Sequence, residues 1–297
     1  MANEKVIYVA PQVMSKHDGY THLMTLYESA RQEPSDSIVF DFTYTTWFEA
    51  NLSAVLGAIC ELLTNQGKHV VVGGCNYAIQ DVLQRNRFLC EFGYEPKRDI
   101  HQTMVAYTRF NPNEGDRFLE YIKNKLLAKP DFPSHSPNLG KKIRESIFEL
   151  YENARTHGLC EQIHACGQYF PRKDNIKRLD LSIVDMGQSI KYNVNNYLGS
   201  QMTGSEAIEW ALKYGNTTKT GDISGGLGLD IMFQFIKLNQ GKVQIISSDG
   251  YWEYRRGEVR MLDFDLSFPG TIVNIEFNLS DTHDYYLEGE ISLDDIF

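Results

Sequence analysis

Hydrophobic residues recur every three or four positions through residues 139–158, which predicts an amphipathic helix. Its apolar positions are Leu139, Ile143, Ile147, Leu150 and Ala154. Gly158 is a typical residue for the end of such a helix. At about 100° per residue, Glu149 and Asn153 lie one above the other along one edge of the apolar face. The pattern therefore predicts a packed helix with a carboxylate and an amide on the same rim.

These two side chains allow two interpretations. Glu149 can orient or deprotonate a water molecule, and the amide oxygen of Asn153 suits Mg²⁺, which prefers oxygen ligands. Alternatively, both side chains belong to an ordinary solvated helix face. The choice depends on the chemistry of other segments of the chain.

The first third of the chain alternates β-branched and aromatic runs with amphipathic stretches. The expected strands cover residues 5–10, 37–42, 68–72 and 104–107, and the expected helices cover residues 22–31, 52–63 and 77–89. This alternation favours a sheet with helices packed on it. Breaks at residues 111–115 and 129–137, on either side of a predicted helix at 118–127, then indicate a domain boundary.

The remaining pattern predicts a mixed, mostly antiparallel sheet covered by helices. Strands are expected at residues 161–170, 179–183, 242–247, 252–255, 260–266 and 271–277, and helices at 206–214 and after the glycines at 225–228. Asp249-Gly250 has the composition of a tight hairpin turn. The expected fold class of the whole chain is therefore α/β, in the form of an α+β sandwich.

Two segments add candidate chemistry. The strand at 179–183 runs into Asp185-x-Gly187, which places a carboxylate at a strand end with a glycine close behind it. A carboxylate there accepts a hydrogen bond from the exocyclic amine of adenine, where guanine presents a carbonyl. The glycines at 225–228 precede a helix, and backbone N–H groups at such a position bind phosphate.

These segments resemble the nucleotide site of the GHKL ATPases, the superfamily of gyrase, Hsp90, histidine kinases and MutL. Its asparagine box is matched by Glu149-x-x-x-Asn153, its first glycine box by Asp185-x-Gly187, and its second by Gly226-x-Gly228-Leu229. Gly270-Thr271 resembles a later motif whose threonine acts beside the adenine-binding aspartate. The matches follow the family's order. The chain departs from the family at Ser189, where the first glycine box usually has another glycine.

The resemblance implies a Bergerat-type domain that binds ATP and Mg²⁺. It implies that Asn153 binds the metal ion, that Asp185 binds the adenine amine and that Thr271 supports the base. Glu149 is then the candidate general base. The other implied nucleotide contacts are Gly187, Gly226, Leu227, Gly228 and Leu229.

A polar region at residues 192–223 corresponds to the lid that closes over the triphosphate in that superfamily. Lys219 or Thr218 reaches a phosphate in one interpretation, and Lys219 is a surface lysine in the other. A lid of this kind orders when the nucleotide binds.

The N-terminal part resembles, less specifically, a STAS domain, the fold of anti-sigma-factor antagonists. The resemblance rests on Asp41-Phe42 and Trp47-Phe48-Glu49 ahead of a helix and on the strand after Gly67. The phosphorylatable serine of that family corresponds here to Ala50 or Asn51, with Ser53 as a shifted candidate. A plain α/β docking domain is the alternative.

Together these segments predict four parts of the chain. They are a STAS-like α/β domain at 1–110, a linker with a short helix at 111–136, a GHKL ATP-binding domain at 137–280 and an acidic tail at 281–297. The tail is expected to be frayed, although its charge also suits a basic patch or a partner.

Histidine and cysteine residues provide two further candidates. His157, Cys160, His164 and Cys166 lack the regular spacing of structural zinc ligands, so buried thiols and a strand histidine are the preferred interpretation over zinc. His135 lies among prolines and is expected to be a linker histidine and not a phosphoacceptor.

Composition and charge limit the expected partners of the chain, the redox state of its cysteines and its location. The 297 residues are 42% hydrophobic and carry a formal net charge of −10, which argues against binding to a nucleic-acid backbone. Five cysteines, an odd number, indicate reduced thiols and not a disulfide framework. No apolar run reaches membrane-spanning length and the N-terminus has no signal-peptide profile, so a cytoplasmic protein is expected.

Three functions are consistent with these features. The preferred one is an ATP-dependent conformational switch in bacterial-type signalling, which acts with a partner protein or a second copy and hydrolyses ATP through Glu149. The second is an anti-sigma-type serine/threonine kinase that phosphorylates a partner. The third is a non-catalytic ATP sensor.

Overall fold

The computed structural model describes residues 4–129, 131–171, 177–213, 215–216, 218 and 230–290. In chain order its strands and α-helices are β1 (Glu4–Tyr8), β2 (Gln12–Val13), α1 (His17–Gln32), β3 (Ser37–Asp41), β4 (Trp47–Phe48), α2 (Ser53–Asn65), β5 (His69–Gly73), α3 (Tyr77–Arg85), β6 (Met104–Phe110), α4 (Gly115–Tyr121), α5 (Pro137–Asn153), β7 (Ile163–Phe170), β8 (Arg178–Asp185), α6 (Ile190–Leu198), α7 (Gly204–Leu212), α8 (Asp230–Asn239), β9 (Lys242–Arg255) and β10 (Glu258–Asn278). The α+β class predicted from the sequence is confirmed.

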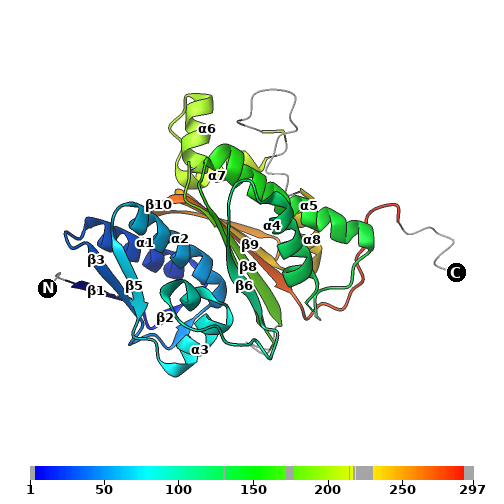
Figure 1. The fold of residues 1–297 in the computed structure, drawn as a ribbon. Coiled ribbons are helices and arrows are strands. Elements are labelled where there is room, and N and C mark those ends of the chain that lie inside the picture. Colours follow the sequence, from blue (N-terminus) through cyan, green and yellow to red (C-terminus); the bar gives the residue numbers. More distant parts are fainter. Residues whose placement is uncertain are drawn as a thin grey trace.

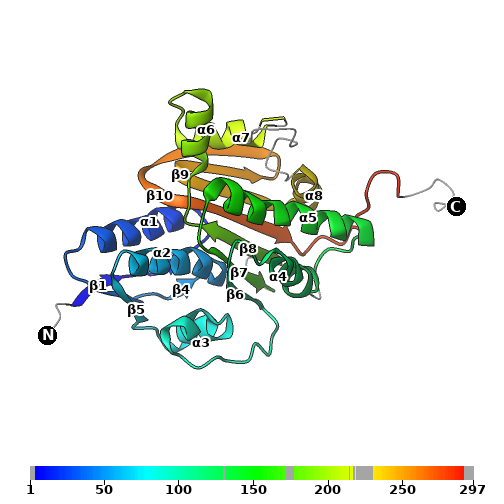
Figure 2. The same ribbon diagram turned by 45° about the horizontal axis from the view of Figure 1, so that its top comes forward.

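A five-stranded antiparallel sheet forms the centre of the molecule, with strand order β6-β7-β8-β10-β9. Beside it lies a parallel three-stranded sheet of order β1-β3-β5. Figures 1 and 2 show the N-terminal elements, in blue and cyan, lying alongside the larger sheet, while α5 crosses that sheet.

Helices cover both faces of the large sheet. The alternation along β8 shows why, because Leu179, Leu181 and Ile183 share a core with residues of α4, α5 and α8. Val184, the residue after Ile183, belongs instead to the core that includes α1 and α2. Successive side chains of a strand point to opposite faces, so both faces of this sheet are packed.

The division between the two sheets falls earlier than the boundary expected after residue 110. Strand β6 was expected to belong to the N-terminal domain, but it pairs with β7 in the large sheet. The N-terminal segment, residues 4–103, therefore packs on the large sheet and shares one hydrophobic core with it. A strand's partner depends on contacts distant in sequence, which periodicity does not report.

The last sheet hairpin differs from the pattern read in the sequence. The four short strands expected between residues 242 and 277 are two long strands, and the chain turns between Arg255 and Glu258. The expectation of a turn at Asp249-Gly250 is wrong. Gly250 serves close packing instead, because a Cβ atom there would lie 2.2 Å from the carbonyl carbon of Gly204 in α7.

The described part of the acidic C-terminal segment, residues 281–290, packs on the sheet domain. Tyr285 is buried and its backbone N–H and carbonyl bond to Ser134 and Ser136. The hydroxyl of Ser136 donates to the carboxylate of Glu290 over 2.5 Å. This stretch is therefore a docked part of the domain and not a frayed end.

None of the helices in the described portions of the chain combines the length and apolar character needed to cross a bilayer.

Candidate functional site

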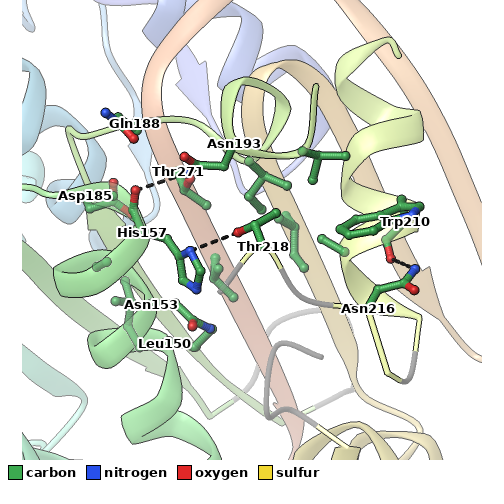
Figure 3. Close-up of a pocket in the computed structure, with 18 residues that line it drawn as sticks. Leu150, Asn153, His157, Asp185, Gln188, Asn193, Trp210, Asn216, Thr218 and Thr271 are labelled. Atoms are coloured by element: carbon green, nitrogen blue, oxygen red, sulfur yellow. Dashed lines mark hydrogen bonds between the residues drawn. The ribbon is translucent and has the colours of Figure 1, made fainter. Parts of the chain in front are cut away.

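A pocket opens at the C-terminal end of α5, on the sheet face that α5 covers. We call it the α5 pocket. It encloses about 820 Å³, including space open to solvent, and residues of α5, α6, α7 and the strands β8, β9 and β10 line it. In Figure 3, Asn153, His157 and Asp185 lie on one side, Trp210 and Asn216 on the other, and Thr218 between them.

Helix α5 brings two polar side chains to the pocket. Ser136 caps the helix by accepting a hydrogen bond from the N–H of Leu139, and Pro137 occupies its first turn. After Asn153 the chain continues as a π-helical turn, Ala154–Gly158. Asn153 and His157, four residues apart, both line the pocket. A π turn of this kind is frequent at functional sites because it redirects the side chains that follow.

Glu149 lies one helical turn before Asn153. Its side chain is exposed and is not part of the pocket lining. It forms no hydrogen bond or ion pair with another described residue. Both residues lie on α5 one turn apart, as predicted, but Glu149 is not among the residues that line the pocket.

Asp185 ends β8 at the inner wall of the pocket and is 7% exposed. Its Oδ1 accepts a hydrogen bond from the N–H of Gly187 over 3.1 Å. Burial raises the pKa of this carboxyl group to about 7, and the Gly187 N–H acts in the opposite direction. Its Oδ2 accepts no hydrogen bond from another described residue. This oxygen can therefore accept a hydrogen bond from a ligand.

Glycines allow three backbone segments to meet around Asp185. A Cβ atom on Gly187 would lie 2.0 Å from the carbonyl oxygen of Gly158, and one on Gly270 would lie 2.0 Å from the carbonyl oxygen of Asp185. Gly270 also has a φ of +156°, which favours glycine. Gly187 and Gly270 are therefore glycines because a side chain at either position would collide with the backbone of a neighbouring segment.

Thr271 lies directly opposite Asp185 in the pairing of β10 with β8. Its Oγ1 lies 3.0 Å from the hydroxyl of Ser247, which is fully buried. Ser247 also accepts a hydrogen bond from the N–H of Ile190 at the start of α6 over 2.9 Å. One hydroxyl pair therefore connects the floor of the pocket to the first residue of α6.

Several polar lining residues were missed by the sequence reading. The sequence suggests His157 only as a possible zinc ligand, but its Nδ1 lies 3.1 Å from the hydroxyl of Thr218 and its carbonyl accepts from the side chain of Asn193 over 3.0 Å. The amide of Asn216 donates to the carbonyl of Trp210 over 2.7 Å. The spacing of His157 from Asn153 was a usable signal. Trp210, Asn193 and Asn216 fall within the region 192–223 that is predicted to be a lid, but no local pattern singles them out as pocket residues, because they reach the pocket through tertiary folding.

Five residues of the predicted site lie outside the described residues: Lys219, Gly226, Leu227, Gly228 and Leu229. Their expected contacts with phosphate remain predictions. Helix α8 begins at Asp230, directly after the glycine segment, and its core residues Met232 and Ile236 pack against the large sheet.

The candidate phosphoacceptor positions of the N-terminal segment are inaccessible. Ala50, Asn51 and Ser53 are all fully buried. The amide of Asn51 donates to Ser15, Ser182 and Asn274, which joins this position to the large sheet. The N-terminal segment would have to separate from the large sheet before a kinase could reach any of these three positions.

The histidines and cysteines of the possible zinc cluster point to different neighbours. His164 is 2.9 Å from the hydroxyl of Tyr107, and burial lowers its pKa to about 3. The Cys166 thiol donates to the carbonyl of Ala50. Within the described ranges, no three His, Cys, Asp or Glu side chains are grouped to hold a metal ion.

Comparison with known proteins adds little to this geometry. No protein-family model matches the chain, and no curated protein matches it. Among the solved structures that match is the histidine kinase domain from Erythrobacter litoralis EL346 blue-light activated histidine kinase, at 12% identity and a TM-score of 0.26. The match covers 89% of this chain and 95% of that one. At that TM-score it carries no argument about function, which rests on the α5 pocket.

Proposed function

We propose that the α5 pocket binds ATP with Mg²⁺ and that the chain acts as an ATP-dependent conformational switch. The observation that carries this proposal is the Oδ2 atom of Asp185, which belongs to a carboxyl group that lines the pocket, is 7% exposed as a residue and accepts no hydrogen bond at Oδ2 from another described residue. An adenine amine supplies the missing donor and stabilises the charged form of the carboxylate. Guanine offers a carbonyl at that position.

The other lining groups suit the rest of the nucleotide. Thr271 would support the base beside Asp185, since the two residues are cross-strand neighbours. Asn153 lines the pocket on the α5 side and would hold Mg²⁺ through its amide oxygen. The metal ion would neutralise charge on the phosphates. The glycine segment at 225–228 would contact those phosphates.

The switching part of the proposal concerns the segment between α7 and α8. Thr218 in this segment contacts His157 at the end of α5, and Asn216 bonds to the carbonyl of Trp210. A nucleotide in the pocket would meet both contacts, because all four residues line it. Binding would therefore bias these two contacts, which involve Asn216 and Thr218. Glu149, exposed one helical turn before Asn153, would orient the water that attacks the γ-phosphate.

The test is incubation of the purified chain with γ-labelled ATP and Mg²⁺, in parallel with the Glu149→Ala variant. Free phosphate and protein-bound label are counted in the same tubes. The proposal predicts free phosphate from the wild-type chain and a loss of about 10²-fold or more in the variant. Turnover equal in both proteins would remove Glu149 from catalysis.

The same tubes separate the two alternative functions. Label that appears only on an added partner protein would identify a kinase, and the hydrolytic switch would then be wrong. Tight ATP binding with neither product would identify a sensor that uses the nucleotide as a structural ligand.

A further inference from the structure

The contact between the N-terminal segment and the large sheet contains five charged side chains, which we call the interface cluster. Glu49, which lies between β4 and α2, is the member from the N-terminal segment. The other four belong to neighbouring strands of the sheet: Arg178 and Asp180 on β8, Glu276 on β10 and Lys242 on β9. The cluster therefore joins the two parts of the molecule through charge.

Ion pairs and strand register connect these side chains. Arg178 donates to Glu49 over 2.6 Å and, through Nε, to the Oδ2 atom of Asp180 over 3.0 Å. The Nζ atom of Lys242 lies 3.1 Å from the carboxylate of Glu276. Glu276 lies opposite Asp180 in the pairing of β10 with β8, and opposite Lys242 in the pairing of β10 with β9. The three carboxylates thus share two cations.

This composition leaves one excess negative charge when every member of the cluster is ionised. Folding has also removed the cluster from water, since Asp180, Glu49 and Lys242 are 0%, 2% and 6% exposed. An uncompensated charge in a desolvated place is costly, and a carboxyl group there binds a proton instead. Charge balance in the docked state therefore requires one proton.

Asp180 is the carboxyl group best placed to hold that proton. Its Oδ1 atom is buried and has no hydrogen-bond partner among the described residues, and an unpaired neutral oxygen costs less than an unpaired charged one. Glu49, in contrast, accepts from the N–H of Ser15 over 2.7 Å as well as from Arg178. Burial and the charge of Glu276 raise the pKa of Asp180, whereas the nearby cations lower it.

The remaining neighbours of Asp180 do not supply a third buried cation. Gln168, its partner on β7, is neutral, and burial raises the pKa of Tyr20 on α1 well above its ordinary value, which keeps that phenol neutral. Water screens the outer basic side chains, because all three are exposed. The other titratable groups of this cavity are Lys16, His17, Asp18, Glu253, Arg255 and Arg260.

We propose that the interface cluster is a pH-sensitive lock, in which the docked N-terminal segment retains one proton on Asp180. Separation of the segment removes Glu49 and opens the cluster to water, where all three carboxylates ionise freely. The docked state therefore holds a proton that the open state releases, so docking weakens as pH rises towards neutrality. The lock needs no nucleotide and does not depend on the function proposed for the α5 pocket.

Hydrogen exchange at Ala50 tests the lock. The N–H of Ala50 donates to the side chain of Gln168 over 2.6 Å, from the N-terminal segment to β7. Its protection factor, corrected for the intrinsic exchange rate at each pH, measures the equilibrium between docked and open states. Between pH 5 and pH 7 this factor should fall about tenfold further in the wild type than in Asp180→Asn, which cannot ionise. Asp185 is present in both proteins, so its own titration cancels.

Glu276→Gln is the second variant, because it removes the excess charge and leaves Asp180 in place. Its protection factor should fall less than that of the wild type over the same pH range, also where Asp180→Asn does not fold. Asp265→Asn, at an exposed position of β10, is the matched control and should behave like the wild type. A fall in Asp180→Asn or in Glu276→Gln as large as that of the wild type would overturn the proposal.

Discussion

At the scale of single residues, Asp185 is the side chain that we propose selects the ligand of the α5 pocket. It combines burial, one engaged oxygen and one oxygen without a described partner at the pocket wall. The Asp185→Asn substitution keeps the size of the side chain but replaces one acceptor by a donor. We expect it to weaken ATP binding about tenfold and to erode the preference for ATP over GTP, because it loses a charge-assisted hydrogen bond.

Competition titrations of ATP against GTP measure this preference. Asp265→Asn is the control, because Asp265 is an exposed carboxylate on β10 outside the pocket. An Asp185→Asn variant that still prefers ATP as strongly as the wild type would contradict the assignment of Asp185 to the base.

The raised pKa of Asp185 also predicts how stability depends on pH. Its carboxyl titrates near 7 in the folded chain and at its ordinary value near 3.8 when unfolded. Between these values the folded chain holds a proton that the unfolded chain has released. The contribution of Asp185 to the free energy of unfolding therefore falls as pH rises from about 4 to 7, by on the order of 4 kcal/mol in total.

Urea unfolding of the wild type and Asp185→Asn at pH 5 and pH 8 isolates this effect. The variant should gain stability relative to the wild type on going to pH 8. Asp180, whose pKa burial also raises to about 7, is present in both proteins and cancels in the difference. A constant difference at the two pH values would show that Asp185 does not titrate in this range.

Asn153 is the residue that we propose holds Mg²⁺. Asn153→Ala removes the amide oxygen, and we expect Mg²⁺-dependent ATP affinity to fall about tenfold or more while the fold is retained. Asn65→Ala, an exposed position on α2, is the control. Binding that responds to Mg²⁺ in Asn153→Ala as it does in the wild type would remove the metal role.

At the scale of elements, the sequence predicted those parts of the site that depend on local pattern. The apolar face of α5, the aspartate at the end of β8 and the glycine beside it follow from periodicity and from strand-end chemistry. The π turn after Asn153 and the roles of Trp210 and Asn216 did not, since they depend on packing between elements distant in the chain.

The glycine beside Asp185 gives a test at this scale. Gly187→Ala would place a Cβ atom 2.0 Å from the backbone oxygen of Gly158, so the strand-end loop must shift. We expect ATP affinity to fall by about tenfold or more, with a stability cost of about 1–3 kcal/mol. Calorimetry and urea unfolding measure the two effects.

Gly73→Ala provides the comparison. Gly73 ends β5 and a Cβ atom there meets nothing within 4 Å, so ATP binding should be unchanged. If Gly187→Ala binds ATP like the wild type, the close approach of the loops around Asp185 is not needed for the nucleotide.

At the scale of the whole molecule, the N-terminal segment and the large sheet share one core. Leu56 and Ile59 of α2 lie in the same buried cluster as Ile246 and Phe268 of the β9–β10 hairpin. Sequence pattern placed the boundary after residue 110 because it reports breaks in the chain and not contacts across it. Asn51, buried against three polar residues, further fixes how the segment docks.

This shared core predicts cooperative unfolding of the described parts. In a variant whose Trp210 and Trp252 are replaced by Phe, the fluorescence of Trp47 reports the N-terminal segment. Its urea midpoint should coincide with the midpoint from far-UV circular dichroism. Two separate midpoints would show that the N-terminal segment unfolds independently and that the shared core contributes little.

The central claim is that the α5 pocket is an adenine nucleotide site, and calorimetric titration of ATP into the wild-type chain with Mg²⁺ tests it most directly. We predict saturable binding of one ATP per chain, weakened when Mg²⁺ is removed, with GTP bound about tenfold less tightly. No saturable ATP binding by a chain that still unfolds cooperatively would contradict the claim.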